Sequence, residues 1–189
     1  MKQTITFDDV LLVPRYSEVV SRKSIDIGNK LSETIFLDLP VIAAPMDTVT
    51  GPTMASTMNE RGALGILHRY NTIREQCLAV GSIKGRKAAA IGVTGNFAER
   101  AVRLVDAGVS ILCVDVAHAH HTLTRHALTV LKNTFGDTIH IMAGNVATLE
   151  AFNDLADWGA DRPVPRAFRR ARPSAARLDR PARDRRPPR

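Results

Sequence analysis

Residues 88–114 read AAAIGVTGNFAERAVRLVDAGVSILCV, and this stretch decides the expected fold. Its two ends, 88–93 and 110–114, are continuous apolar runs, which are typical of strands covered on both faces. Between them Asn96 can cap a helix over 97–107, and Gly108 marks the end of that helix. The expected apolar face of the helix consists of Ala98, Ala101, Val102, Leu104 and Val105. Strand, helix and strand in this order predict a right-handed βαβ unit and a parallel sheet.

The same unit repeats on both sides of this stretch. Further short apolar runs lie at 40–44, 63–67 and 138–142, so that successive runs begin roughly 22–28 residues apart. Helix signals fill the gaps. Pro52 suits the first turn of a helix ending near Gly62, and Thr72 with Glu75 forms a capping box that opens a helix toward 82. A last helix is expected over 148–158, so the sequence predicts five strand–helix units.

Polar residues gather directly after each expected strand. They are Met46-Asp47-Thr48, His68-Arg69-Tyr70-Asn71, Thr94-Gly95-Asn96, Asp115 with His118, and Asn145. A site at the carboxyl ends of parallel strands is common to a doubly wound sheet and a (β/α)8 barrel. Both architectures remain open on this pattern, although no G-x-G-x-x-G follows the first strand, which disfavours the Rossmann type.

The net charge of +7 and the pI near 10 suggest a nucleic-acid binder until the charge is divided along the chain. Residues 162–189 contain 11 Arg and 2 Asp, a net charge of +9, and six of the ten prolines. Residues 1–161 hold 15 basic and 17 acidic residues, a net charge of −2. The sequence therefore predicts two parts, a slightly acidic α/β body over 1–161 and an Arg/Pro/Ala-rich, disordered tail over 162–189.

The composition of the chain also indicates in which cellular compartment the protein is expected. No apolar run approaches the ~20 residues that span a membrane, and no signal peptide precedes the body. Two cysteines, Cys77 and Cys113, are too few for a disulfide scaffold. A cytoplasmic protein that does not contact the membrane is expected.

Five ordered motifs in residues 5–161 resemble the IMP dehydrogenase / GMP reductase family. They are Phe7-Asp8-Asp9-Val10-Leu11-Leu12-Val13-Pro14, Ala43-Ala44-Pro45-Met46-Asp47-Thr48-Val49-Thr50, Gly65-Ile66-Leu67-His68-Arg69, Val114-Asp115-Val116-Ala117-His118 and Ala143-Gly144-Asn145-Val146-Ala147-Thr148. The resemblance implies the first part of a (β/α)8 TIM barrel that acts on a purine mononucleotide with NAD, or alternatively NADP. It further implies a homotetramer and a monovalent cation in the complete enzyme.

The resemblance also assigns site residues. Asp115, Val116, Ala117 and Asn145 match cofactor-binding positions, and Ala44, Met46 and again Asn145 match substrate-binding positions. A carboxylate such as Asp115 can accept hydrogen bonds from ribose hydroxyls, but it can equally cap the next helix. Asn145 offers both a donor and an acceptor. For Met46, plain core filling is the alternative.

The two reactions of the family both work at purine C2, where a cysteine thiolate adds and a hydride moves to or from nicotinamide. That cysteine belongs to a loop after the sixth strand, and neither Cys77 nor Cys113 matches it. Only residues 76–87 separate the second and third units, so the CBS modules common in IMP dehydrogenases are not inserted there. Met46-Asp47-Thr48-Val49-Thr50 favours IMP dehydrogenase, while Asp115-Val116-Ala117-His118 is closer to GMP reductase, which stays the alternative.

The remaining polar and glycine-rich features have structural explanations that need no ligand. His118, His120 and His121 lack the i, i+4 spacing and the carboxylate of a metal set, so no metal is expected. The Gly92-Val93-Thr94-Gly95 turn can cradle a phosphate at a helix N-terminus, or can be only a tight turn. Asp8 and Asp9 are interpreted as structural capping residues, and Cys113 as a buried apolar residue.

The tail interrupts the repeat where a sixth strand is due. Pro163 and Pro165 remove strand donors and argue against a central strand. Arg, Pro and Ala make up 22 of the last 28 residues, which suggests a reading-frame shift near Asp161 and a truncated, inactive barrel without its catalytic cysteine loop. The alternative is a half-barrel whose basic arm binds nucleic acid without sequence specificity.

Overall fold

The computed structural model of the chain describes residues 10–165. Two compact units make up the chain, residues 15–166 and a second unit of residues 1–14 and 167–189. Of the second unit, the structure describes 10–14, an exposed segment without regular secondary structure. The interpretations of Asp8, Asp9 and residues 166–189 lie outside the described residues.

The larger unit is built on a six-stranded parallel sheet. Its strands are β3 (Ile42–Ala43), β4 (Leu64–Leu67), β5 (Ala88–Ile91), β6 (Ile111–Asp115), β7 (His140–Val146) and β8 (Arg162–Pro165). The helices between them are α1 (Pro52–Glu60), α2 (Ile73–Gly81), α3 (Phe97–Asp106), α4 (Thr122–Phe135) and α5 (Leu149–Asp157). None of these described helices is long and apolar enough to cross a membrane.

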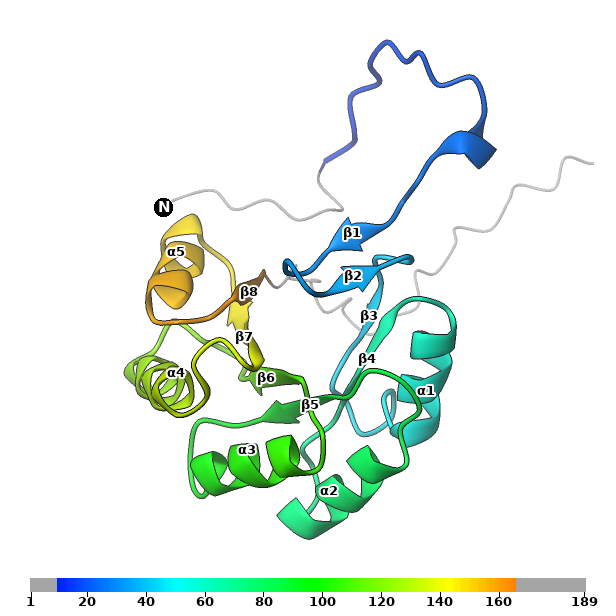
Figure 1. Cartoon of the computed structure of the whole chain (residues 1–189). Coiled ribbons are helices and arrows are strands. Elements are labelled where there is room, and N and C mark those ends of the chain that lie inside the picture. The colour runs from blue at the N-terminus through cyan, green and yellow to red at the C-terminus, as the bar shows by residue number, and fades with distance from the viewer. Residues whose placement is uncertain (1–9, 166–189) are drawn as a thin grey trace, which may run out of the picture. The chain divides into compact units, whose positions relative to one another are not determined.

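The strand order separates the two architectures that the sequence left open. Each strand pairs with its neighbour in the chain, in the order β3-β4-β5-β6-β7-β8, and the order never reverses. A doubly wound sheet reverses its order at a switch point, whereas a barrel does not. The five helices all lie on the convex side of the curved sheet (Figure 1). The unit is therefore a half-barrel, part of the TIM-barrel fold.

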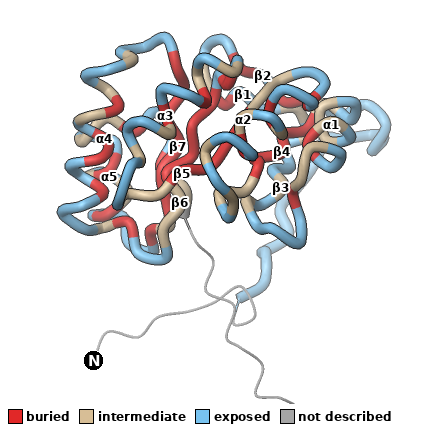
Figure 2. The backbone as a smooth tube through the Cα atoms, turned by 90° about the horizontal axis from the view of Figure 1, so that it is seen from below, coloured by how far each residue is buried: buried red, intermediate tan, exposed pale blue. Residues whose placement is uncertain are grey.

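Two apolar clusters follow from the alternation of side chains along each strand. Leu67, Ile91, Leu112, Val114 and Ile141 face the helices and belong to the larger cluster. Leu64, Ile66, Ala88, Ala90, Ile111, Cys113 and Met142 lie on the opposite, inner face and form the smaller cluster. Figure 2 shows that burial is concentrated on these strands. The continuous apolar runs of β4 to β7 thus reflect strands covered on both faces, as predicted. The prediction is wrong for the run at 40–44, because Val41 and Ile42 are exposed.

A short antiparallel hairpin covers the inner face at the amino ends of the strands. It consists of β1 (Asn29–Lys30) and β2 (Phe36–Leu37), and it follows a 3-10 turn, η2 (Arg22–Ser24). Leu31, Ile35 and Leu37 join the inner cluster. Arg86, just before β5, donates to the Phe36 carbonyl at 3.3 Å, which ties the hairpin to that end of the sheet. The sequence pattern did not predict this hairpin.

The predicted helix signals are confirmed at α2. The Thr72 hydroxyl accepts from the Glu75 N–H at 3.2 Å, and the Glu75 carboxylate accepts from the Thr72 N–H at 2.9 Å. At α3 the expected end is also confirmed, since the helix stops at Asp106 and Gly108 follows with φ of +95°. The expected cap by the Asn96 side chain is wrong, because its Nδ2 donates to the Glu99 carboxylate instead. Two residues of the expected apolar face, Ala98 and Val102, are instead exposed, because the helix turns Ala101 and Leu104 toward the sheet.

The tail was expected to be disordered from residue 162, and this is wrong for residues 162–165. Arg162–Pro165 forms β8, which pairs in parallel with β7. Proline is tolerated here because β8 has one neighbour within the described sheet and because the φ of proline suits extended backbone. A Cβ on Gly144 would lie 2.9 Å from the Val164 carbonyl oxygen, so the small residue in β7 allows the approach. The α/β body therefore extends past 161.

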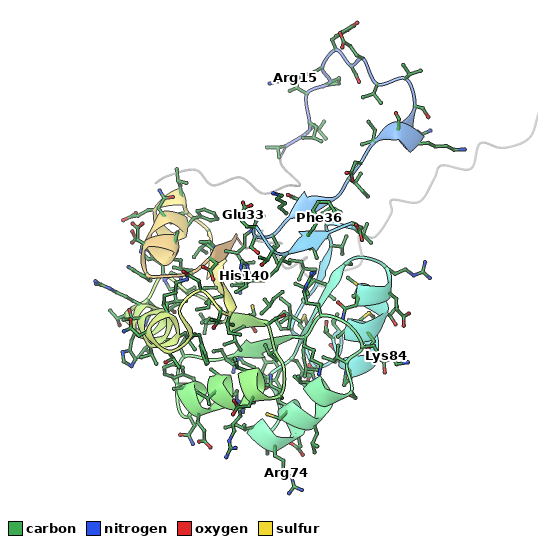
Figure 3. The ribbon with its side chains drawn as sticks, viewed as in Figure 1. Arg15, Glu33, Phe36, Arg74, Lys84 and His140 are labelled. Atoms are coloured by element: carbon green, nitrogen blue, oxygen red, sulfur yellow. The ribbon has the colours of Figure 1, made fainter. Side chains whose placement is uncertain are left out.

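His140 begins β7 on the inner face, where it is labelled in Figure 3. Its Nε2 is buried with no hydrogen-bond partner among the described residues, and its Nδ1 lies 4.0 Å from an Asp161 carboxylate oxygen. Burial lowers the pKa of His140. The Asp161 charge opposes this shift, whereas Arg162 and Lys132 add to it. The imidazole is therefore held neutral inside the fold at a pH where an unfolded chain begins to bind a proton.

This arrangement predicts a pH-dependent stability. Because the folded-state pKa of His140 lies below the ordinary 6.5, the unfolded chain takes up the proton first. The free energy of unfolding should fall as the pH drops from about 6.5 toward the folded-state pKa, and by no more than ~1.4 kcal/mol per pH unit for one proton. Urea unfolding at pH 8, 7, 6 and 5, followed by Trp158 fluorescence, measures this slope.

The His140→Gln variant should lose most of that slope between pH 7 and pH 5. The matched control is His126→Gln, which changes an exposed imidazole on α4 and should keep the wild-type slope. Equal slopes in the two variants would assign the pH dependence to other groups.

Candidate functional site

The carboxyl ends of the strands carry the polar residues that the sequence singled out. In β6, Asp115 continues the inner row that contains Ile111 and Cys113, so alternation places it on the inner face at the end of the strand. Asp115 pairs with Gly144 across the β6–β7 ladder. It is half-buried, and it takes part in interactions within the fold. This is the position from which a carboxylate can meet a ligand lying over a parallel sheet.

Backbone bonds lock the segment after Asp115 onto the end of β7. The Val116 N–H donates to the Gly144 carbonyl at 2.9 Å, and the Asn145 N–H donates to the Val116 carbonyl at 2.8 Å. The Asn145 side-chain Nδ2 donates to the same Val116 carbonyl at 2.9 Å. The Ala119 N–H then donates to the Asn145 carbonyl, also at 2.9 Å. Four hydrogen bonds therefore join Val116 and Ala119 to Gly144 and Asn145, and Asp115 and Ala117 adjoin Val116 in the chain.

The two remaining site positions come from the other side of the sheet. Ala44 and Met46 follow β3, which β4 and β5 separate from β6. A tight turn holds them: the Met46 N–H donates to the Ala44 carbonyl at 2.8 Å, and the buried Thr50 hydroxyl donates to that carbonyl at 2.6 Å. Met46 is 51% exposed, so it does not fill the core.

Two of the three histidines after β6, His120 and His121, have local roles. His120 Nε2 lies 2.7 Å from an Asp154 carboxylate oxygen, and its ring stacks on Trp158. His121 Nδ1 accepts from the Leu123 N–H at 3.1 Å and caps α4. Among residues 10–165 no group of three or more His, Cys, Asp or Glu side chains is arranged to hold a metal. The loop after Asp115 is thus tied to both α4 and α5.

Neither cysteine has the surroundings of a nucleophile. Cys113 lies inside β6, and burial, with a smaller effect of the Asp115 charge, raises the pKa of its thiol to about 12. A thiol with this pKa is protonated at neutral pH, whereas the thiolate is the reactive form. Cys77 lies on α2, and its Sγ contacts the Arg103 carbonyl at 3.4 Å. The interpretation of Cys113 as a buried apolar residue is confirmed.

A buried polar cluster behind the rim was missed by the sequence reasoning. Gln76, on α2, is fully buried, and its Nε2 donates to the His68 carbonyl at 3.0 Å and to the Ala90 carbonyl at 2.8 Å. Its Oε1 accepts from Arg100 Nη1 at 2.5 Å, and Arg100 Nη2 donates to the Asn71 carbonyl at 3.0 Å. One amide therefore joins the ends of β4 and β5 to α3. The sequence did contain a signal for this cluster: Gln76 lies four residues before Val80, so both residues share the buried face of α2.

Comparison with known proteins agrees with this arrangement. Residues 4–163 match the family described as the IMP dehydrogenase / GMP reductase domain. The chain is 32% identical to inosine-5'-monophosphate dehydrogenase from Cryptosporidium parvum, across 83% of this chain and 50% of that protein. It is 26% identical to GMP reductase from Leishmania major, across 85% of this chain and 61% of that protein.

A solved structure gives the same result in three dimensions. The fold superposes on inosine 5' monophosphate dehydrogenase from Legionella pneumophila with a TM-score of 0.80 and 44% sequence identity. The match covers 86% of this chain and 50% of that one. The chain thus spans about half the length of the relatives that it matches.

Proposed function

Because the chain belongs to the IMP dehydrogenase / GMP reductase family, we propose that its strand ends bind a purine mononucleotide and a nicotinamide dinucleotide, as in an IMP dehydrogenase. The observation that carries this proposal is the locked junction of Asp115, Val116, Ala117 and Asn145 at the carboxyl ends of β6 and β7. Carboxyl ends of barrel strands are where ligands of this fold class bind.

The residues of this junction suit the ribose and nicotinamide portion of a dinucleotide. The Asp115 carboxylate is half-buried at the inner edge, where it can accept hydrogen bonds from ribose hydroxyls. Asn145 acts mainly as a positioning residue, because its Nδ2 holds the Val116 carbonyl. Val116 spends its N–H and its carbonyl on Gly144 and Asn145, so it holds the segment in place and Ala117 offers backbone groups to the ligand. The cofactor, when bound, supplies the hydride acceptor or donor.

Ala44 and Met46 suit the purine base. Both are exposed at the carboxyl end of β3, and Met46 is a large apolar side chain left half in solvent. A flat, weakly polar purine gains by covering such a side chain, because apolar surface leaves water. The turn that holds them is fixed by the buried Thr50 hydroxyl, so the surface is preformed. The proposed substrate and cofactor contacts therefore belong to different strands of one rim.

The covalent step of the family has no nucleophile among Cys77 and Cys113, the two cysteines of the chain. We therefore expect the 189-residue chain to bind these ligands without measurable turnover of IMP with NAD or of GMP with NADPH. IMP dehydrogenase is preferred over GMP reductase because of Met46-Asp47-Thr48-Val49-Thr50, and the 44% identity to the Legionella enzyme supports the same choice.

The test is an NMR titration of the ¹⁵N-labelled chain with NAD and with IMP. NAD should shift the amides of 115–119 and 145–147, and IMP those of 44–50. Asp115→Asn should weaken NAD binding about tenfold, since it removes a charged acceptor worth roughly 1.5–3 kcal/mol. The matched control, Asp106→Asn at the exposed end of α3, should bind as wild type. Unchanged amides at 115–119 under saturating NAD would refute the proposal.

A further inference from the structure

A small cavity of about 140 Å³ opens beside the proposed site, at the ends of β4 and β5. Arg69 comes from the loop after β4, Arg100 from α3, and Gly92, Thr94 and Asn96 from the turn that leads into α3. The volume exceeds the ~30 Å³ of one water molecule and falls short of the ~300 Å³ of a small-molecule pocket. It suits one compact group and not a whole nucleotide.

Two positive charges converge on this cavity without a counter-charge. Within the described part of the chain, neither Arg69 nor Arg100 forms an ion pair with a carboxylate. Burial lowers the pKa of Arg100, and the nearby charge of Arg69 lowers it further. Both guanidinium groups remain protonated in proteins, so they repel each other across the cavity. An anion between them would remove this repulsion.

The neighbouring carboxylates are engaged elsewhere. Glu75 accepts from the Thr72 N–H at 2.9 Å, and Glu99 accepts from Asn96 Nδ2 at 3.3 Å. The Asp115 carboxylate belongs to β6 and does not line the cavity. The positive potential of the two arginines is therefore not cancelled by a side chain that lines the cavity.

Some hydrogen-bond donors at the cavity have no acceptor among the described residues. The Nε of Arg69 is buried and has no partner in the described structure. Its Nη1 lies over Gly92, where a Cβ would be only 3.5 Å away. No side chain caps the N-terminus of the ten-residue α3, whereas Thr72, His121 and Thr148 cap α2, α4 and α5. Exposed first-turn N–H groups favour an anion.

The second arginine is held in place in advance. Arg100 donates to Gln76 and to the Asn71 carbonyl, and Gln76 is itself fixed by two backbone carbonyls. These bonds use two of the five N–H donors of the guanidinium group. The remaining donors need no reorganisation to meet a ligand, which lowers the cost of binding.

We propose that this cavity, the Arg69–Arg100 pocket, binds a phosphate group, with Arg69, Arg100 and the N–H groups at the start of α3 as its donors. Arginine is suited to this because its planar fork meets phosphate oxygens with paired hydrogen bonds. The phosphate source is either the diphosphate of a dinucleotide or free inorganic phosphate. The pocket shares no residue with Asp115–Ala117 or Asn145, so it stands whether or not the nicotinamide proposal does.

The experiment titrates the ¹⁵N-labelled 189-residue chain with inorganic phosphate, with pyrophosphate and with NAD at low ionic strength. Phosphate or pyrophosphate should shift the amides of 92–99 in a saturable way, and added salt should weaken the binding. Competition by NAD identifies the dinucleotide as the source, whereas binding that NAD does not displace identifies free phosphate. If none of the three ligands shifts 92–99, the proposal is overturned.

The decisive variant is Arg69→Gln, because the buried Nε of Arg69 has no hydrogen-bond partner in the described fold and its guanidinium lies only over the exposed Tyr70 ring, so its loss should leave the fold intact. We expect about tenfold weaker phosphate binding, the loss of one charge-assisted contact. Arg74→Gln is the matched control: it removes an exposed arginine of α2, labelled in Figure 3, that does not line the pocket. Equal affinities in both variants would overturn the proposal. Shifts at 115–119 report separately on the nicotinamide site.

Discussion

We expect the Gly65→Ala variant to lose about 3 kcal/mol of its free energy of unfolding, the upper end of the cost of overpacking a core. Gly65 lies in the middle of β4, facing α1. A Cβ at this position would lie 2.5 Å from the Cα of Ala55, a backbone atom that no side-chain rotation can move. Ala55 is fully buried, so either α1 or β4 must shift. Because a domain is stable by about 5–15 kcal/mol, this loss is large.

The measurement is equilibrium urea unfolding at pH 8, followed by the fluorescence of Trp158, the one tryptophan of the chain. The matched control is Gly81→Ala at the end of α2, where a Cβ would meet nothing within 4 Å. Alanine is a better helix former than glycine, so Gly81→Ala should be neutral or more stable by up to ~1 kcal/mol. A Gly65→Ala variant as stable as Gly81→Ala would show that α1 does not pack as closely on β4.

A second large effect is expected at Gln76. In Gln76→Leu the shape is nearly kept, but the buried Ala90 carbonyl and the partly buried His68 carbonyl lose a donor, and Arg100 loses an acceptor. A buried group left without its partner costs roughly 1–3 kcal/mol, so the free energy of unfolding should fall by about 3 kcal/mol. The same loss should free Arg100 to move, which weakens the phosphate pocket as well.

Two comparisons separate these effects. Leu78→Ala changes an exposed residue of the same helix, 68% accessible, and should alter stability by less than ~0.5 kcal/mol. Gln76→Glu keeps an acceptor for Arg100 but lacks the donors for the His68 and Ala90 carbonyls, so its stability should fall between Gln76→Leu and wild type. If Gln76→Leu unfolds at the wild-type urea concentration, the amide does not hold the strand ends together.

Much of the fold was predictable from local patterns. The continuous runs at 63–67, 88–93 and 110–114 predicted buried parallel strands, and each strand lies within one or two residues of its run. The Thr72–Glu75 capping box and Gly108 predicted helix ends that the structure confirms. These signals are local, because a cap or a turn needs only residues a few positions apart.

Other elements were missed for physical reasons. No helix was assigned to 122–135, although α4 buries Thr124, Ala127, Leu128 and Leu131 at helical spacing; its polar first turn, capped by His121, hides the pattern. The β1–β2 hairpin has strands of two residues, too short for any alternation to show. β8 was missed because its prolines lack ladder donors, and only the tertiary structure shows that the segment still pairs with β7.

The candidate site, too, was predicted in part from the sequence and in part only by the tertiary structure. The sequence by itself determined that Asp115, Asn145, Ala44 and Met46 stand where strands end, since this depends on the repeat of apolar runs. Only the tertiary structure decided that the strands keep one order, that Asn145 holds the Val116 carbonyl, and that Arg69 and Arg100 converge on one cavity. Periodicity encodes which face of a strand is buried, whereas the convergence of charges 31 residues apart depends on β4, β5 and α3 packing together, which no local pattern records.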